Sequence, residues 1–174
     1  MPPAPFPDWL GAIMEVIIPQ CGLPDPACWP TSCNLNFYES ASDAAGAHAD
    51  DEQLFEGKLR EITIISLSLG GTRDFSLHNL SLTPLASIPL ASGDLMVMEN
   101  WSQSLVKHAL LKLPAGSSDD PQRINLTWRW ISAHQAGCPE FSSAEAGSPP
   151  QLPVDSPPPD IVQASDAMWE AHRA

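Results

Sequence analysis

The chain has 174 residues and a formal net charge of −13, with 21 acidic and eight basic side chains. This length predicts one domain with a sizeable core, and no apolar run approaches the roughly 18 residues of a membrane-spanning helix. The scarcity of basic residues argues against the strongly basic face that is typical of nucleic-acid-binding proteins.

The cysteines indicate a reducing compartment. Cys21, Cys28, Cys33 and Cys138 form no Cys-x-x-Cys pair, which argues against a structural zinc site and favours free thiols. The opening stretch MPPAPFPDWLG lacks the charged and apolar regions of a secretory signal. We therefore expect an intracellular protein, in the nucleus or the cytoplasm, that does not bind membranes.

One helix is predicted near the N-terminus, within PDWLGAIMEVIIP. Its apolar residues recur at three- and four-residue spacing and so share one face: Leu10, Ile13, Met14 and Ile17. Asp8 is placed to cap the N-terminus of this helix, and Pro19 is expected to end it.

Short β-rich segments separated by turn residues follow. In chain order they are CNLNFYE, ITIISLSLG, RDFSLHN, ASIPL, DLMVM, LVKHALL and RINLTWRWI. The run ITIISLSLG is typical of a central strand that is covered on both faces. One helix followed by about seven strands predicts an all-β sandwich or barrel with a helical flank.

The composition changes at Gly137. Residues 137–174 carry many prolines, serines and alanines, and six acids against one arginine. Such a segment buries too little apolar surface to offset the entropy of ordering it. We therefore expect a folded domain over residues 1–136 and a mostly disordered, acidic tail over 137–174.

A candidate metal site comes from the stretch AGAHADDEQ. Residues i and i+2 of an extended segment point to the same side, so His48 and Asp50 can meet one ion, and His108 is the natural third ligand. Two histidines and one carboxylate on one face of a metal form the facial triad of non-haem Fe(II) oxygenases. The spacing also arises by chance, and a single strand histidine is often a packed core residue, so the motif alone leaves both interpretations open.

The segment RINLTWRWI alternates polar and apolar residues with period two. Its polar face holds Arg123, Asn125, Thr127 and Arg129. An edge strand with one solvated face shows the same alternation. The functional alternative is that the two arginines clamp a dicarboxylate in a pocket. Because 2-oxoglutarate is the dicarboxylate that one class of Fe(II) oxygenases requires, the metal motif and the arginine motif support each other.

Five pieces of the sequence stand in the order of a known family: NFY, HADDE, IISLSLGGTRDF, LASGDLMVMENWSQSLVKH and RINLTWR. Together they resemble the AlkB family of Fe(II)/2-oxoglutarate dioxygenases, from about Pro7 to Ile131. The last piece fits the specific pattern Arg-x-Asn-x-Thr-x-Arg. The resemblance implies a double-stranded β-helix, which is a jelly roll of two sheets with iron between them.

The resemblance also implies roles for individual residues. By position, His48, Asp50 and His108 match the catalytic Fe(II) ligands. The residues that match the 2-oxoglutarate site are Asn36, Tyr38, Arg123, Asn125 and Arg129. Arg123 matches the arginine that pairs with the distal carboxylate, and Arg129 lies nearer the iron-chelating end. On the substrate side, Asp51 and Glu52 match acids beside a flipped base, and Arg73 matches a family arginine.

The activity implied by the resemblance is oxidative demethylation of alkylated nucleobases in DNA or RNA, in repair or RNA modification. Fe(II), 2-oxoglutarate and O2 are then required, and succinate, CO2 and formaldehyde are released. The implied partner is alkylated single-stranded DNA or RNA, whose base must leave the stack to reach the iron. We expect the enzyme to be a monomer.

Two departures from the family keep alternatives open. Only 35 residues precede Asn36, so the family's nucleotide-recognition lid is expected to be reduced or missing, and few basic residues remain for phosphate contacts. Both features favour an AlkB-like oxygenase acting on a protein or another non-nucleic-acid substrate. A non-catalytic jelly-roll binding module is the third alternative, against which the intact set of His48, Asp50, His108, Arg123 and Arg129 argues. Outside the site, we expect His78 to face solvent.

Overall fold

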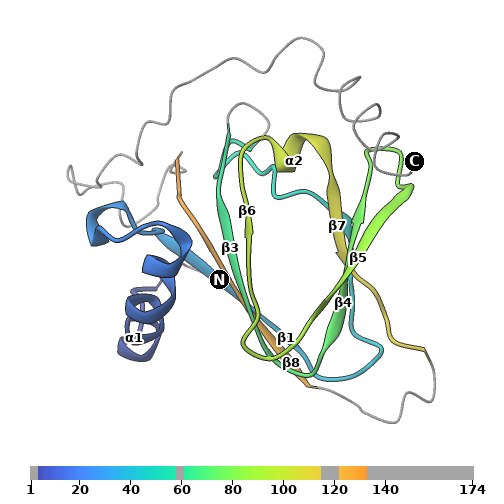
Figure 1. Cartoon of the computed structure of the whole chain (residues 1–174), viewed down its shortest axis with the longest axis horizontal. Coiled ribbons are helices and arrows are strands. Elements are labelled where there is room, and N and C mark those ends of the chain that lie inside the picture. The colour runs from blue at the N-terminus through green and yellow to red at the C-terminus, as the bar shows by residue number, and fades with distance from the viewer. Residues whose placement is uncertain (1–3, 58–60, 115–121, 133–174) are drawn as a thin grey trace.

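A computed structural model describes residues 4–57, 61–114 and 122–132 of the chain. In these residues two α-helices, two short 3₁₀ helices and eight strands follow one another (Figure 1). In chain order they are α1 (Asp8–Ile17), the 3₁₀ helices Ile18–Cys21 and Pro26–Cys28, β1 (Ser32–Tyr38), β2 (Ala45–His48), β3 (Ile64–Gly70), β4 (Arg73–His78), β5 (Pro84–Leu90), β6 (Leu95–Met98), α2 (Ser102–Leu105), β7 (Lys107–Leu110) and β8 (Arg123–Arg129).

The strands form two antiparallel four-stranded sheets, with the orders β1-β8-β3-β6 and β2-β7-β4-β5. Figure 1 shows the two sheets facing each other, with α1 on the outer side of the first. Most neighbours in the sheets are distant in sequence, as β8 lies between β1 and β3, whereas β4 and β5 are consecutive. The predicted all-β jelly roll with one N-terminal helix is confirmed.

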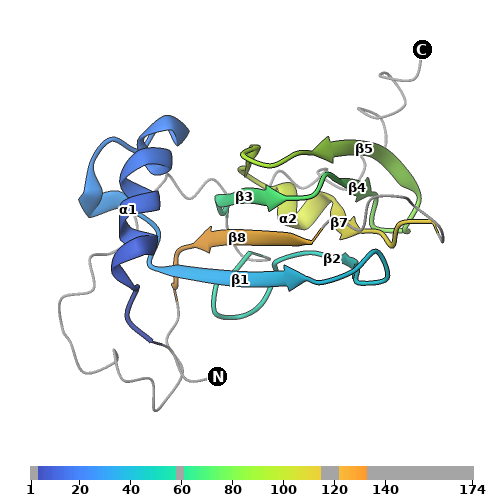
Figure 2. The same cartoon turned by 90° about the horizontal axis from the view of Figure 1, so that it is seen from below.

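The main core lies between α1 and the outer face of the first sheet. Its buried members come from α1, the residue that follows α1, β3 and β8: Leu10, Met14, Ile18, Ile65, Leu67, Leu126 and Trp128. Figure 2 shows α1 running across the direction of β1, β8 and β3. Because α1 packs on one face of the sheet to form this core, the opposite face of β8 points between the two sheets.

A smaller apolar cluster stands near the end of the jelly roll where β2 and β3 meet the connecting loop. Phe55, Ile62 and Ile64 are buried in it, and Met98 packs against them. The backbone of Gly57 lies close to the backbone of Asp50 at the other end of this loop. A Cβ atom at position 57 would lie only 2.7 Å from the carbonyl oxygen of Asp50. The loop from Asp50 to Gly57 is therefore tightly folded.

The predicted elements agree with the observed ones apart from a few details. Asp8 does not cap α1: it is the first helical residue, the cap position is Pro7, and no side chain bonds to the free N–H groups there. An eighth strand, β2, is not among the seven predicted β-rich segments, and His48 is its last residue. No helix among the described residues is long and apolar enough to cross a membrane. The tail predicted for 137–174 lies outside the described residues.

Candidate active site

Two neighbouring strands bring the two candidate histidines together. In the antiparallel pair β2–β7, His48 stands directly opposite His108, and directly opposed side chains lie on the same face of a sheet. The two ring centroids are 4.4 Å apart. Asp50 follows two residues after His48, just beyond the end of β2, and its side chain returns toward both rings.

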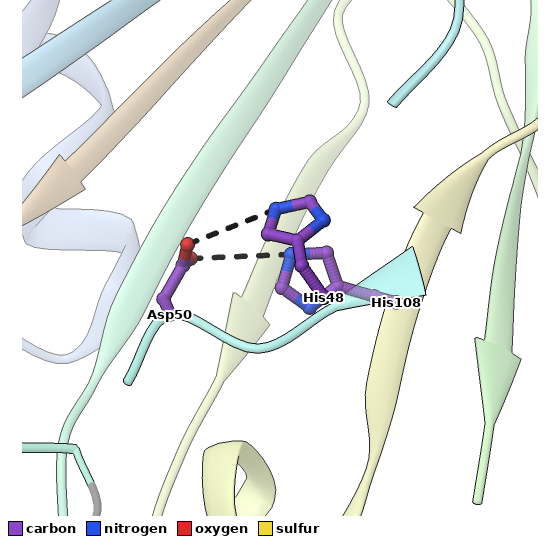
Figure 3. A group of neighbouring side chains, drawn as sticks. All are labelled: His48, Asp50 and His108. Atoms are coloured by element: carbon purple, nitrogen blue, oxygen red, sulfur yellow. Dashed lines mark ion pairs between the residues drawn. The ribbon is translucent and has the colours of Figure 1, made fainter. Parts of the chain in front are cut away.

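The three side chains converge on one point (Figure 3). The Asp50 carboxylate oxygens lie 3.9 Å from Nε2 of His48 and 4.0 Å from Nε2 of His108. One ligand atom from each residue lies within 4.8 Å of the other two. Two ligands of one ion at about 2 Å each stand no more than about 4 Å apart, so a small rotation of the rings suffices to close this set on a metal.

Both imidazoles are prepared to offer a lone pair. The Nδ1 atom of His48 lies 2.7 Å from the carbonyl oxygen of Gly46. Since that oxygen only accepts, Nδ1 carries the proton and Nε2 remains free for a metal. Burial lowers the pKa of His108 to about 4, although the neighbouring Asp50 charge opposes this. His108 is therefore neutral at physiological pH, as a metal ligand must be.

The Asp50 carboxylate is held from its other side by an arginine. Nη2 and Nε of Arg129 donate to the same oxygen of Asp50, Oδ2, at 2.6 and 3.1 Å. Asp50 is only 4% exposed and Arg129 is also buried, so each charge depends on the other for compensation. Arg129 additionally lies over the Phe55 ring, 5.2 Å from its centroid. The candidate ligand is thus fixed before any metal binds.

The second arginine of β8 lies at the opposite end of the same polar face. Nη2 of Arg123 donates to Ser68 Oγ and to Asn125 Oδ1, both at 2.8 Å, and the guanidinium carbon lies 5.3 Å from the centroid of the Tyr38 ring. Burial lowers the pKa of Arg123, and Tyr38 partly offsets this. A guanidinium group stays protonated even so, so Arg123 is a cation held in a polar wall.

One cavity of about 160 Å³ joins the three converging side chains to this wall. It is lined by all eight residues that the sequence predicted for the metal and for 2-oxoglutarate: Asn36, Tyr38, His48, Asp50, His108, Arg123, Asn125 and Arg129. The structure therefore brings the two predicted motifs into one space. The polar face of β8 is turned inward and is not the solvated face of an edge strand.

Two buried guanidinium atoms in this region have no hydrogen-bond partner among the described residues. They are Nε of Arg123 and Nη1 of Arg129. Unpaired buried donors are costly, and carboxylate oxygens are strong acceptors for guanidinium N–H groups. The donor set of His48, Asp50 and His108 likewise fits ferrous iron. The unpaired guanidinium atoms fit 2-oxoglutarate, and the His-Asp-His set fits iron.

The residues predicted for the substrate side do not line this cavity. Asp51 is half-buried and Glu52 is exposed, both directly after Asp50. Arg73 is 1% exposed and its Nη2 donates to the carbonyl oxygens of Asp43 and Leu111, at 2.8 and 2.6 Å. Its charge is thus used inside the fold, to tie the loop before β2 to the end of β7.

His78 also differs from its prediction. It is buried, and its Nε2 lies 2.9 Å from Ser76 Oγ. Sequence reasoning missed several residues of the site as well. Ser66, Phe75 and Met98 line the cavity, and the Phe75 ring stacks on His108 at 5.2 Å. All three lie in segments predicted as strands, but the continuous apolar run that contains Ser66 gave no signal for which of its side chains point inward.

Comparisons with known proteins agree with this geometry. The family model described as the 2OG-Fe(II) oxygenase superfamily matches residues 2–129. No curated protein matches the chain. Among solved structures, "The structure of OsALKBH1" is similar at 23% identity with a TM-score of 0.54, covering 73% of this chain and 67% of that chain. At this identity the likeness concerns the fold alone.

Two more remote structures complete the comparison. The Escherichia coli ribosomal oxygenase YcfD has 12% identity and a TM-score of 0.44, covering 95% of this chain and 44% of that chain. An RmlC-like cupin from Desulfovibrio desulfuricans has 14% identity and a TM-score of 0.31, covering 56% of this chain and 81% of that chain. Both likenesses are too weak to support an argument.

Proposed function

The chain belongs to the 2OG-Fe(II) oxygenase superfamily, and from this premise we propose that it demethylates alkylated nucleobases in DNA or RNA by oxidation. Superfamily membership implies Fe(II), 2-oxoglutarate and O2. The predicted resemblance to Fe(II)/2-oxoglutarate oxygenases is confirmed by the family model, and the fold is shared with OsALKBH1. Within the superfamily we propose the AlkB family, as the sequence motifs indicate. The chain is therefore a dioxygenase, and its substrate is the part that we propose.

The observation that supports an oxygenase centre here is that the triad and the arginine wall share one cavity, and the nucleobase substrate is proposed from the AlkB-like motifs of the sequence. We assign His48, Asp50 and His108 as the ligands of Fe(II). Arg123 and Arg129, with Asn36, Tyr38 and Asn125 as further polar contacts, are assigned to 2-oxoglutarate. When bound, the iron centre supplies oxidative decarboxylation of 2-oxoglutarate to succinate and CO2, coupled to hydroxylation of a substrate C–H bond.

The protein's own groups position and shield this chemistry. The Arg123 guanidinium, oriented by Ser68 and Asn125, offers a rigid fork to a carboxylate. Arg129 orients the Asp50 carboxylate through Oδ2. Phe75 holds the His108 ring by stacking and keeps one side of it dry. An N-methyl group hydroxylated here leaves the base as formaldehyde, and Asp51 and Glu52 are the acids that we assign to the substrate side.

A second candidate substrate is a protein side chain, and one observation favours it. Among the described residues the basic side chains outside the buried interior are Lys107, which is half-buried, and Lys112, which is exposed. Each neutralised phosphate contributes about one unit to the salt dependence of nucleic-acid binding. The part of the surface that the structure describes therefore offers few cations to a polyanion, whereas binding of a peptide does not require them.

One set of measurements tests both levels of the proposal. Fe(II) and 2-oxoglutarate are added to the full chain without oxygen, and the visible charge-transfer band of the chelated ferrous site is recorded. If this band is absent and 2-oxoglutarate is not turned over, the result supports the non-catalytic binding module. Formaldehyde release is then compared for methylated single-stranded DNA, methylated RNA and methylated peptides, with His108→Ala as the inactive control. Release from peptides alone refutes the nucleobase assignment and leaves the dioxygenase.

A further inference from the structure

Helix α2 lies beside the candidate metal site without providing a ligand. It connects β6 to β7, the strand that carries His108 (Figure 1). Its second residue, Gln103, is only 2% exposed. A buried primary amide is costly unless its donor and acceptor groups are satisfied, so the partners of Gln103 show what it does.

The amide oxygen of Gln103 reaches the backbone of the candidate ligand Asp50. The Asp50 N–H donates to Oε1 of Gln103 at 2.9 Å, in a buried hydrogen bond across 53 residues of sequence. Asp50 lies beyond the end of β2, so this N–H is outside the ladder of the sheet. Gln103 thus supplies the contact that a strand neighbour supplies elsewhere.

The other contacts of α2 fix the direction of this amide and the shape of the loop. Nε2 of Gln103 donates to Ser102 Oγ at 3.2 Å and lies 3.7 Å from the Met98 sulfur, so Oε1 is left for Asp50. Ser104 Oγ donates to the carbonyl oxygen of Gly57 at 3.0 Å. Consecutive residues of α2 therefore hold both ends of the loop from Asp50 to Gly57.

We propose that Gln103 is a positioning residue that sets the Asp50 carboxylate for the metal. The inference rests on the proposed function, in which Asp50 is a ligand. Arg129 fixes the carboxylate oxygen and Gln103 fixes the backbone of the same residue, from two different elements. Outer-shell partners of this kind typically change metal affinity by about 10–100-fold when they are lost.

The test uses all 174 residues and Mn(II), a divalent cation that carboxylate and water oxygens suit as ligands. Free Mn(II) is measured by electron paramagnetic resonance for the wild type and for Gln103→Leu, Gln103→Glu and Gln20→Leu. Gln103→Leu removes the acceptor and is expected to weaken binding about 10–100-fold. Gln103→Glu keeps an acceptor and is expected to retain most of the affinity. Gln20→Leu is the matched control, because it makes the same exchange at an exposed glutamine whose Nε2 donates to the carbonyl oxygen of Val16, and it is expected to bind like the wild type.

A second measurement reads the hydrogen bond itself. Amide exchange at Asp50 in the metal-free wild type is expected to be slow for a residue outside a strand, and faster in Gln103→Leu. Wild-type affinity in Gln103→Leu overturns the inference. If that variant does not fold, Asp50 exchange as fast as in an exposed loop of the wild type overturns it equally. Failure of the wild type to bind Mn(II) refutes the proposed function itself, which is a distinguishable result.

Discussion

The buried ion pair between Arg129 and Asp50 gives the sharpest prediction. Both side chains are nearly inaccessible, and Arg129 donates twice to Asp50 Oδ2, at 3.1 and 2.6 Å. Arg129→Met keeps an apolar stem of similar length but leaves the carboxylate buried without its partner. Breaking such a pair costs about 3–5 kcal/mol. With about 2–4 °C of Tm per kcal/mol for a chain of this size, the metal-free variant is expected to melt about 6–20 °C below the wild type.

A divalent cation provides an internal check on this magnitude. If Asp50 is a metal ligand, bound Mn(II) compensates its charge, so the Tm difference between wild type and Arg129→Met is expected to shrink in Mn(II) relative to EDTA. Differential scanning calorimetry in the two buffers measures both values. Asp50→Asn in the Arg129→Met background separates charge from packing, because the neutral amide needs no cation and is expected to recover part of the loss. An equal Tm loss with and without Mn(II) refutes the reasoning.

Three further outcomes follow from the same structure. Arg123→Leu is expected to weaken 2-oxoglutarate binding to the Mn(II)-loaded protein by about 10–100-fold, because a hydrogen bond to a charged group contributes roughly 1.5–3 kcal/mol. Isothermal titration calorimetry measures this affinity, and an unchanged value removes Arg123 from the site. Gly70→Ala is expected to destabilise the fold by more than about 2 kcal/mol in urea denaturation, because Gly70 has φ +90° and a Cβ there collides with the carbonyl oxygen of Gln122; a midpoint like the wild type contradicts this. The pKa of His108 falls from 6.5 to about 4 on folding. Its contribution to stability is therefore present above pH 6.5 and is lost as pH falls toward 4. Metal-free His108→Gln is expected to lose less stability in acid than the wild type, and parallel curves of stability against pH for the two proteins exclude this role.

The period of two in RINLTWR was the most informative pattern in the sequence. It predicted that Arg123 and Arg129 share a face, and a strand backbone enforces that geometry without help from the rest of the fold. The same reasoning put His48 and Asp50 on one side of an extended segment. Which side chains of a strand share a face can be predicted from the sequence, because it depends only on residues that are close together in the chain.

Contacts that depend on pairing register were not readable from spacing alone. His108 faces His48 because β2 and β7 are neighbours in that register, and the third ligand was first chosen as a plausible histidine and then by the AlkB resemblance. Gln103 gave no signal, since a short polar turn such as Ser102–Leu105 looks like any surface loop. The AlkB resemblance predicts Arg73 for the substrate side, and only the folded chain shows the carbonyl groups of Asp43 and Leu111 that its guanidinium contacts.

Strand β8 has a consequence for how this protein can fail. Its odd-numbered side chains form the wall of the cavity and its even-numbered ones complete the core, so a slip of one residue against β1 and β3 exchanges the two sets. Trp128 then faces the cavity that we assign to 2-oxoglutarate, and the guanidinium groups of Arg123 and Arg129 enter the apolar core. A molecule in which β8 is shifted by one residue is therefore expected to have no turnover. The correct register of this strand and the activity of the enzyme depend on each other.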